Sequence, residues 1–459
     1  MKRISKRTIF LLVLMAVLAL GVGFFVGRYF LKGDDWAVFP GSPHVYTGSN
    51  LSTGTVTDRK GVLLLDSTDG KTYSENPALR KATMHLLGDR FGYISAPVLK
   101  EFADELVGFT PVNGLYSLGD VSNQAVLTID AQVQMEAQKI LSGRKGTIGV
   151  YNWKTGEILC AVTSPTYDPD NMPDIENDVS GAYDGVYLNR FFQTTYTPGS
   201  IFKVLTTAAA LETWDDALDR TFHCDGTYQI GADQIICNGV HGDTNLRNAL
   251  ANSCNVAFAQ IAVALGPEIM TEYANKLGIN SSLTFDGLTT AKGHYDVSQA
   301  AESELGWSGI GQYTNLVNPC QYMTFMGVVA GGGKAALPHL MQEVPGGLTK
   351  IYEAKTEKTE QLLDPAVTDT LADMMRNNVV NKYGAWQFPD LYVCAKSGTA
   401  EIGPNDTPHA TFAGFIRDQE YPLAFIVIVE HGGSGSATCA PIAGQELHAC
   451  VNAMAAEKE

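Results

Sequence analysis

The chain is short of basic residues, with 32 Lys and Arg against 49 Asp and Glu, which gives a formal net charge of −17. A surface of this sign repels the phosphates of nucleic acids, so we predict no nucleic-acid partner. Charged residues of both signs are also few, at 18%, whereas apolar residues make up 45% of the 459 residues. This composition is typical of a globular protein with a large core, and the length accommodates two domains.

Internal repeats and low-complexity blocks are absent, and only one long uncharged run occurs, at residues 8–27. About 20 such residues span a bilayer. Basic residues stand before the run and directly after it, namely Lys2, Arg3, Lys6, Arg7, Arg28 and Lys32. Because the four before it favour a cytoplasmic N-terminus, we predict cytoplasmic residues 1–8 and a transmembrane signal anchor at 9–30. A cleaved signal peptide with a weak small-residue site at Ala19-Leu20-Gly21 stays open as the alternative.

All eight cysteines follow this run, in the part predicted to lie outside the cytoplasm. Some cysteines pair in an oxidising compartment, and Cys224 and Cys237 flank a turn-rich stretch, so they are our first candidate for a disulfide. Cys439 and Cys450 are a second candidate. No C-x-x-C or C-x-x-H spacing of a metal site occurs, so we predict no metal ion.

The chain divides at about residue 125. Residues 31–125 mix a strand-like run at 61–66 with a helix-like run at 96–106, which predicts a short α+β module. After it, Asp130 can cap a helix that continues to Leu141. A β-hairpin follows, with strands at 147–151 and 157–162 around a short turn.

The C-terminal part repeats the strand pattern. Three strand candidates follow one another at 392–400, 409–416 and 423–430, and a final helix is predicted at about 441–456. The stretch between the hairpin and these strands is mainly helical. We therefore predict an α/β (α+β) domain over 126–459, in which an antiparallel sheet is assembled from both ends around an inserted helical block.

Three short motifs occur in a fixed order: Ser200-Ile-Phe-Lys203, Ser253-Cys-Asn255 and Lys396-Ser-Gly-Thr399. Such a set of S-x-x-K, S-x-N and K-T/S-G motifs is typical of penicillin-binding proteins and class A β-lactamases. Each motif alone has little weight, because the chain also contains Ser142-Gly-Arg-Lys145, Ser74-Glu-Asn76 and Lys154-Thr-Gly156. The surrounding sequence must separate the functional copies from the chance copies.

Ser200 follows the chain breakers Pro198 and Gly199 and precedes an apolar helical run. It is therefore predicted at a helix N-terminus, where free N–H groups favour developing negative charge. Lys203 lies one turn later, and its apolar neighbours disfavour the charged ammonium, so it can take the proton of Ser200. The structural alternative is a simple helix cap with a surface lysine. Ser142 lies in a polar turn without these features.

The second motif lies between two helical runs, so Ser253 and Asn255 can both point into a cleft. The structural alternative for Ser253 is an N-cap. In the third motif, Lys396 stands in a predicted strand; its alternative is an edge-strand lysine that discourages aggregation. Together with the hydroxyls of Ser397 and Thr399, Lys396 can bind a carboxylate. We expect Gly398 to allow close approach of a substrate backbone.

On these motifs, the chain resembles the transpeptidase domain of class B, monofunctional penicillin-binding proteins over roughly residues 126–459. Further stretches resemble family landmarks in family order, namely Leu127–Asp130 with Gln134, Ser164–Pro169, Asn189-Arg190, Tyr196–Ser200, Gly309–Gln312 with Pro319, and His409–Phe415. Asp58–Gly61 weakly resembles the start of the N-terminal pedestal of the family. The chain departs from the family in its short pedestal, in Ser397 where Thr is common, and in Thr411 where an aromatic residue is common.

The resemblance implies an extracytoplasmic D,D-transpeptidase that cross-links peptidoglycan by acyl transfer and is acylated by β-lactams. It implies that Ser200 is the acylated nucleophile and that Lys203 is its general base. Ser253 would pass a proton to the leaving amine, Asn255 would hold the substrate amide, and Lys396 and Thr399 would bind the terminal carboxylate. The oxyanion hole would consist of the N–H groups of Ser200 and Thr399.

The resemblance also implies binding partners and leaves alternative functions open. Expected partners are peptidoglycan stem peptides, β-lactam antibiotics, the cytoplasmic membrane and, by analogy, a polytopic glycan polymerase; no metal or organic cofactor is needed. A D,D-carboxypeptidase or a serine β-lactamase on the same scaffold remains an alternative, as does a non-catalytic cell-wall scaffold. The anchor, the additional module and the landmarks favour the transpeptidase.

Overall fold

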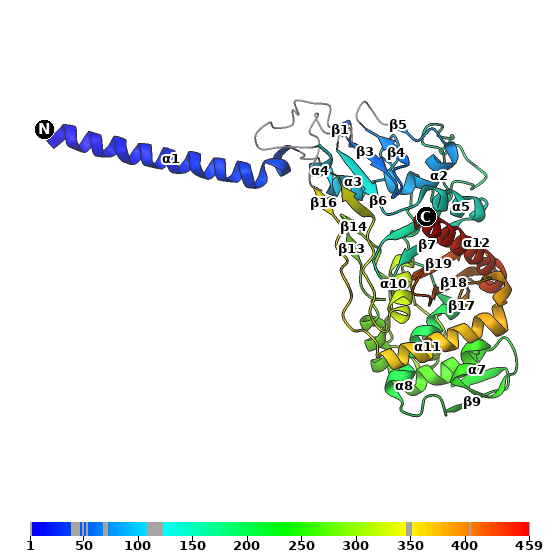
Figure 1. The fold of residues 1–459 in the computed structure, drawn as a ribbon. Coiled ribbons are helices and arrows are strands. Elements are labelled where there is room, and N and C mark those ends of the chain that lie inside the picture. Colours follow the sequence, from blue (N-terminus) through cyan, green and yellow to red (C-terminus); the bar gives the residue numbers. More distant parts are fainter. Residues whose placement is uncertain are drawn as a thin grey trace.

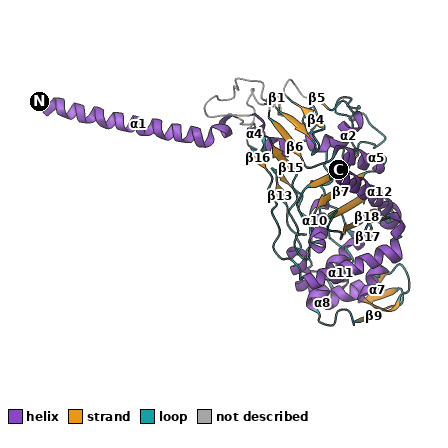
Figure 2. Ribbon diagram, in the orientation of Figure 1, coloured by secondary structure: helices purple, strands orange, loops and turns teal. Residues whose placement is uncertain are grey.

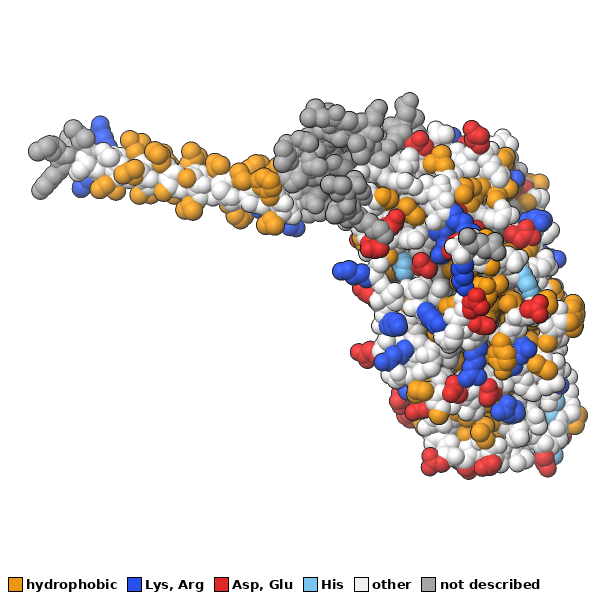
Figure 3. Space-filling model, in the orientation of Figure 1, with side chains coloured by type: hydrophobic (Ala, Val, Ile, Leu, Met, Phe, Trp, Pro, Cys, Tyr) orange, Lys and Arg blue, Asp and Glu red, His pale blue; other side chains and the backbone are white. Residues whose placement is uncertain are grey.

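The computed structural model describes residues 2–37, 46–47, 50–51, 54–67, 72–107, 123–345, 351–403 and 405–458. The predicted module at 31–125 therefore lies partly outside the described residues. Helix α1 (Lys2–Ala37) projects away from the rest of the chain (Figure 1). The most apolar 18-residue window of its segment Ser5–Gly33 has a mean hydropathy of 3.0, and none of that window is buried. Figure 3 shows hydrophobic side chains exposed along this helix. The helix is long and apolar enough to cross a membrane once, as an anchor does.

The largest antiparallel sheet has five strands in the order β17-β18-β19-β7-β8. Their bounds are β7 (Gly146–Asn152), β8 (Ile158–Ser164), β17 (Val393–Ala400), β18 (His409–Ile416) and β19 (Leu423–Val429). The predicted hairpin and the three predicted C-terminal strands are confirmed, and the sheet is assembled from both ends of the domain. Strand β19 lies at its centre and is buried along its full length, which explains its continuous apolar sequence.

Helices cover both faces of this sheet (Figure 2). Successive side chains of β19 alternate between the faces. Phe425 and Val427 pack with α5 (Ala131–Leu141) and α12 (Gly435–Ala456). Ile426 and Ile428 point to the opposite core, with α6 (Lys203–Thr213), α8 (Asn255–Lys276) and α10 (Pro319–Ala330). The sheet is thus the middle layer of the domain.

Two of these helices test sequence predictions of helix starts. The side chain of Asp130 accepts hydrogen bonds from the N–H groups of Gln132 and Val133, as its predicted capping role requires. Helix α12 begins at Gly435, six residues before the predicted start at Pro441. Ser434 caps it by accepting a hydrogen bond from the Ala437 N–H. The predicted start was wrong because proline is common in the first turn of a helix, and the prediction therefore placed Pro441 there. In the structure Pro441 lies inside α12, where its missing N–H removes one hydrogen bond.

A second sheet has six strands in the order β16-β15-β6-β3-β4-β5. Their bounds are β3 (Thr55–Thr57), β4 (Leu63–Asp66), β5 (Thr72–Tyr73), β6 (Gln124–Leu127), β15 (Met341–Val344) and β16 (Tyr352–Glu353). Helices α2 (Pro77–Leu87), α3 (Pro97–Glu101) and α4 (Ala103–Val107) belong to the same region. Strands β15 and β16 come from far beyond residue 125, so a late segment of the chain completes the sheet of the N-terminal module.

The inserted block between β8 and β17 is mainly helical, as predicted. Besides α6, α8 and α10, it contains α7 (Leu246–Ala251), α9 (Glu302–Gly309) and α11 (Pro365–Asn378). Small antiparallel pairs also interrupt it, among them β9 (Thr221–Cys224) with β12 (Gly242–Asn245), and β10 (Thr227–Ile230) with β11 (Asp233–Ile236). These two pairs lie immediately before the second motif in the chain.

All eight cysteines are free thiols in the structure, so both predicted disulfides are wrong. Cys439 and Cys450 belong to the same helix, α12. Eleven residues of helix separate them by about 16 Å along the axis, far beyond the reach of a disulfide. Cys224 and Cys237 both lie next to His241 instead of bonding to each other.

Glu446 of α12 is an unusual member of the core, because its carboxyl is 1% exposed. Its Oε1 accepts a weak hydrogen bond of 3.8 Å from the Cys450 thiol. Its Oε2 has no hydrogen-bond partner in the described part of the chain. Burial raises the pKa of Glu446 to about 8. The carboxyl therefore stays protonated in the folded protein at neutral pH.

We expect Glu446→Gln to remove a pH-dependent loss of stability. The carboxyl of the unfolded chain ionises above its ordinary pKa of 4.5, whereas the folded one holds its proton up to about 8. The folded state thus binds more protons in this window, and stability falls as the pH rises through it. In thermal melts of the detergent-solubilised protein, the melting temperature of the variant relative to that of the wild type should rise between about pH 5 and pH 8. Glu360→Gln, at an exposed loop position, is the control; equal pH slopes for wild type and Glu446→Gln would contradict the assignment.

Candidate active site

Ser200 lies in a short 3₁₀ turn, Gly199–Phe202, that leads directly into α6. Gly199 has φ of +58°, and a Cβ there would lie 2.7 Å from the carbonyl oxygen of Thr399. The glycine therefore lets the Ser200 turn approach β17 closely. The predicted position at a helix start is confirmed. Neither this turn nor α6 is capped by a side chain, so Ser200 is not the simple cap of the structural alternative.

Lys203 is completely buried at the first position of α6. Its Nζ donates hydrogen bonds to Ser253 O at 2.7 Å, to Asn255 Oδ1 at 2.7 Å and to Ser253 Oγ at 3.2 Å. Burial, and secondarily the charge of Lys396, hold the pKa of Lys203 well below its usual range. The alternative of a surface lysine is therefore wrong, and this amine is suited to accept a proton.

Ser253 occupies the turn between α7 and α8 in a left-handed conformation, with φ of +52°. A non-glycine residue adopts this region only when its surroundings enforce it. The N-cap of α8 is Cys254, whose Sγ accepts a hydrogen bond from the Ala257 N–H at 3.3 Å. The predicted alternative of Ser253 as an N-cap is thus wrong, and its hydroxyl points toward two lysines instead.

The second of these lysines is Lys396, on β17. This strand is an edge of the five-stranded sheet, yet Lys396 is completely buried, which excludes the protective edge lysine of the structural alternative. Its Nζ donates hydrogen bonds to Ser253 Oγ at 3.0 Å and to Ser397 O at 2.9 Å. Burial lowers the pKa of Lys396 to about 7. One serine hydroxyl therefore lies between two desolvated amines.

Gly398 makes room for the turn that carries Ser200. A Cβ at this position would lie 2.2 Å from Thr411 Oγ1 and 2.8 Å from Pro198 O. The missing side chain thus lets this turn approach β17, and Gly398 is not among the residues that line the cleft. Thr411 pairs with Gly398 across β17 and β18, and its hydroxyl donates a hydrogen bond of 3.0 Å to Pro198 O.

The segment before Ser200 is fixed to the end of β19 by a buried ion pair. Arg190 Nε lies 2.8 Å from Glu430 Oε1, and the Tyr196 hydroxyl donates to the same oxygen at 2.9 Å. The guanidinium lowers the pKa of the Glu430 carboxyl against the opposing effect of burial. Arg190 and Tyr196, seen in the sequence only as landmarks, therefore help to hold the segment before Ser200 in place.

A cleft of about 350 Å³ opens beside these groups. It is lined by five residues expected from the sequence, namely Ser200, Ser253, Asn255, Ser397 and Thr399. Seven further residues line it: Ile310 and Gln312 belong to the landmark Gly309–Gln312, whereas Asn238, Trp307, Glu401, Ser434 and Ser436 belong to no motif. Tyr383 was also missed, although its hydroxyl accepts a hydrogen bond of 3.1 Å from the Ser397 N–H. The residues outside any motif come from separate helices and loops, so no local pattern could have selected them.

The fold and the site together define a class of protein. They combine a serine at a helix start, a desolvated lysine one turn later, a second serine between two lysines, and an edge strand along a cleft. This is the arrangement that serine acyltransferases of the penicillin-recognising type require, with a nucleophile, a base and donors for a carboxylate.

Comparison with known proteins identifies the family. The family model described as the penicillin binding protein transpeptidase domain matches residues 146–448, and the chain belongs to this family. The peptidoglycan D,D-transpeptidase PbpA of Mycolicibacterium smegmatis is 30% identical over 347 residues, which cover 69% of this chain and 70% of the relative. Stage V sporulation protein D of Bacillus subtilis is 26% identical over 75% of this chain and 55% of its own length.

Solved structures agree with this assignment. Penicillin-binding protein A of Mycobacterium tuberculosis, captured as a ceftriaxone acyl-enzyme complex, superimposes with a TM-score of 0.76 at 25% identity. The match covers 87% of this chain and 98% of that structure. Penicillin-binding protein 2 of Helicobacter pylori, solved in complex with MreC, shares the fold with a TM-score of 0.61 over 71% of this chain and 63% of that chain. The predicted family, fold and enzyme class, a serine penicillin-binding transpeptidase, are confirmed.

The contact of Gly398 with the Ser200 turn can be tested by stability. Gly398→Ala should force the turn away from β17 and lower the free energy of unfolding by about 1–3 kcal/mol, as overpacking does. Urea unfolding of the detergent-solubilised protein measures this change. The control is Ser397→Ala at the adjacent, partly exposed position, which should change stability by less than about 0.5 kcal/mol. Equal stability of Gly398→Ala and the wild type would show that the turn is not tightly held.

Proposed function

We propose that this protein is a peptidoglycan D,D-transpeptidase in which Ser200 forms an acyl-enzyme with the D-Ala-D-Ala end of a stem peptide. The acyl group then passes to the amine of a neighbouring stem peptide. The observation that carries the proposal is the position of the Ser253 hydroxyl, 3.2 Å from Lys203 Nζ and 3.0 Å from Lys396 Nζ, at the edge of the cleft that Ser200 lines. The D,D-transpeptidase relatives support the substrate class.

In the acylation step, Ser200 Oγ attacks the carbonyl carbon of the D-Ala-D-Ala amide bond. Lys203, whose pKa is lowered by burial, takes the hydroxyl proton in its neutral form. The backbone N–H groups of Ser200 and Thr399 stabilise the oxyanion that forms. One such donor commonly contributes on the order of 3 kcal/mol to lowering the barrier.

The leaving amine needs a proton as the amide bond breaks. Ser253 supplies it from its hydroxyl. The hydroxyl then regains a proton from Lys203, whose Nζ lies 3.2 Å from Ser253 Oγ. Asn255 holds Lys203 through its Oδ1 and has an amide group for the substrate backbone. Lys396, Ser397 and Thr399 bind the terminal carboxylate of the peptide.

The second step distinguishes this function from its rivals. A β-lactamase or a D,D-carboxypeptidase uses the same acylation groups and lets water attack the acyl-enzyme, whereas a transpeptidase lets an amine attack. The similarity to PbpA favours the transpeptidase. We also propose that β-lactams acylate Ser200, because penicillin-binding protein A of M. tuberculosis has been captured as a penicillin G acyl-enzyme at 25% identity.

We propose that α1 anchors the protein with its N-terminus inside, so that the catalytic domain lies outside the cytoplasm. Basic residues before the apolar segment support this orientation. The proposed division is 1–8 in the cytoplasm, 9–30 in the membrane, 31–125 as the short pedestal and 126–459 as the transpeptidase domain. A polytopic glycan polymerase is the proposed partner of the pedestal, by analogy with the family.

Labelling with fluorescent penicillin tests the nucleophile. Purified wild type should form a covalent adduct that survives denaturation, and Ser200→Ala should form none, because the attacking hydroxyl is gone. Intact mass follows the lifetime of the adduct. Ser142→Ala is the matched control, since Ser142 begins the other Ser-x-x-Lys sequence, and it should label as the wild type does. A long-lived adduct fits the transpeptidase, whereas rapid loss of the adduct indicates a β-lactamase, and persistent labelling of Ser200→Ala refutes the nucleophile.

Reporter fusions test the orientation. Alkaline phosphatase fused after Glu459 should be active, because that enzyme acquires its disulfides only outside the cytoplasm. The same reporter fused after Gly33, at the far end of the apolar segment, should also be active. Reversing the charge of Lys2, Arg3, Lys6 and Arg7 together should reduce both signals. A cytoplasmic C-terminal reporter in the wild type would overturn the orientation.

A further inference from the structure

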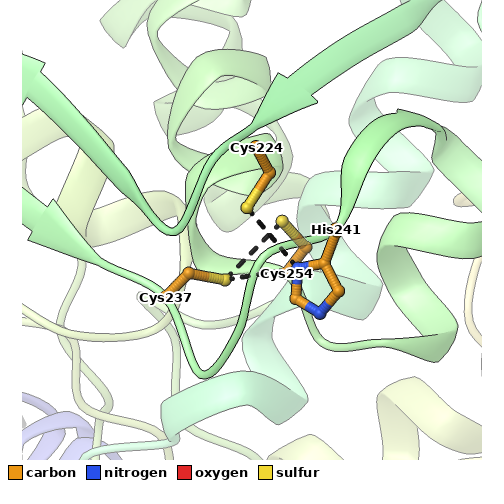
Figure 4. Close-up of side chains that lie close together, drawn as sticks. All are labelled: Cys224, Cys237, His241 and Cys254. Carbon is orange, nitrogen blue, oxygen red and sulfur yellow. Dashed lines mark hydrogen bonds between the residues drawn. The ribbon is translucent and has the colours of Figure 1, made fainter.

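Four metal-ligand side chains that the sequence did not connect lie together behind the second motif. They are Cys224, Cys237, His241 and Cys254, and their ligand atoms all lie within 4.8 Å of one another. Figure 4 shows the three sulfur atoms and the imidazole of His241 gathered around a common centre. Cys224 and Cys254 are buried, whereas Cys237 and His241 are partly exposed, which leaves a path to solvent.

The distances within this cluster fit a tetrahedral metal ion. Zinc with Zn–S bonds of about 2.3 Å and a Zn–N bond of about 2.05 Å has S···S edges of about 3.8 Å and S···N edges of about 3.6 Å. The observed separations are 3.5 Å from Cys224 Sγ to His241 Nδ1 and 3.5 Å from Cys237 Sγ to the same nitrogen. Cys237 Sγ and Cys254 Sγ lie 3.7 Å apart.

We propose that Cys224, Cys237, His241 and Cys254 bind one structural Zn²⁺ ion that holds the Ser253–Asn255 turn in its active position. Three thiolates and one imidazole are a donor set that favours zinc over the hard cations Mg²⁺ and Ca²⁺. Binding releases three thiol protons to water and changes no oxidation state. Four protein ligands close the coordination sphere, so the ion does not enter the acyl-transfer chemistry.

The surrounding backbone prepares this geometry. The His241 N–H donates to Cys224 O at 3.0 Å, next to the β9–β12 pair, and the Cys237 N–H donates to Gly226 O at 2.9 Å. Cys254 is the N-cap of α8, where the Ala257 N–H donates to its sulfur at 3.3 Å. The sulfur of Cys254 is thus held in place by the first turn of α8.

The cluster is connected directly to the active site through Cys254. This residue stands between Ser253, which contacts both lysines, and Asn255, which contacts Lys203. The Asn255 side chain also donates to Ile236 O at 3.0 Å, at the end of β11. A metal ion at this point crosslinks the strands before the motif to the motif itself and fixes the left-handed turn at Ser253.

A disulfide is the competing arrangement for these thiols. The 3.7 Å between the sulfur atoms of Cys237 and Cys254 would have to shorten to about 2 Å, and an odd number of three thiols leaves one cysteine unpaired. Zinc engages all three thiols and the imidazole with the observed spacing. It also protects them from oxidation outside the cytoplasm.

Metal content tests the site without reference to activity. The full-length protein, purified in detergent and incubated with Zn²⁺, should retain one zinc ion per chain after gel filtration, measured by elemental mass spectrometry. Co²⁺ in its place should give the visible bands of tetrahedral cobalt and thiolate-to-cobalt charge transfer. Failure of the reduced protein to bind zinc overturns the proposal. So does a Cys237–Cys254 disulfide found by mass spectrometry in the protein as purified.

Matched variants separate coordination from folding. His241→Ala and Cys224→Ser should lose zinc, whereas His241→Cys should keep it, because cysteine supplies a replacement ligand. Cys394→Ser, at a buried cysteine outside the cluster, should keep the full zinc content. Circular dichroism of each variant checks the fold. Zinc retained by both His241→Ala and Cys224→Ser would contradict the assigned ligands.

The positioning role rests on the proposed function and needs its own measurement. Removing zinc from the wild type with a chelator should slow acylation by fluorescent penicillin on the order of tenfold or more. Added Zn²⁺ should restore the rate, and Mg²⁺ should not. An unchanged rate in zinc-free protein overturns the positioning role. Absence of labelling in zinc-loaded protein would overturn the proposed function instead, while the zinc content would still support the metal site.

Discussion

The burial of two lysine amines around one serine hydroxyl is the constraint on which the rest of the site depends. Lys203 and Lys396 are completely buried, so each must find acceptors within the protein. Their hydrogen bonds converge on Ser253 Oγ. This requirement brings together α6, the turn before α8 and β17, which lie far apart in the chain. Burial also lowers the pKa of both amines, so the packing that holds the fold together makes the neutral, proton-accepting form of Lys203 available for acyl transfer.

Close backbone approach is the second constraint. The Ser200 turn can reach β17 only because Gly199 and Gly398 have no side chains in the space between them. The hydroxyl of Thr411 then donates a hydrogen bond to the carbonyl oxygen of Pro198. On the other side, Arg190 and Tyr196 fix the preceding segment to Glu430. Ser200 is thus held by the sheet on both sides of its turn.

The cysteine cluster extends this argument beyond the cleft. Lys203 contacts the residues on both sides of Cys254, and Cys254 faces Cys237 and the rest of the cluster. The turn that carries Ser253 is therefore contacted on one side by the two buried amines and on the other by the cluster. The motif Ser253-Cys-Asn255 therefore contacts both the buried lysines and the cysteine cluster. Its central residue, Cys254, connects the two.

The sequence by itself determined the elements and the motif residues, because their signals are local. The apolar run of β19, the hairpin of β7 and β8, and the cap at Asp130 each depend on neighbouring residues. Only the tertiary structure decided which cysteines meet, what Gly398 makes room for, and where α12 begins. Cys224, Cys237, His241 and Cys254 belong to separate segments whose convergence is set by strand pairing and helix packing, and no local spacing encodes it. Gly398 and Thr411 likewise meet only through the register of two strands, which follows from burial of the sheet and not from either residue.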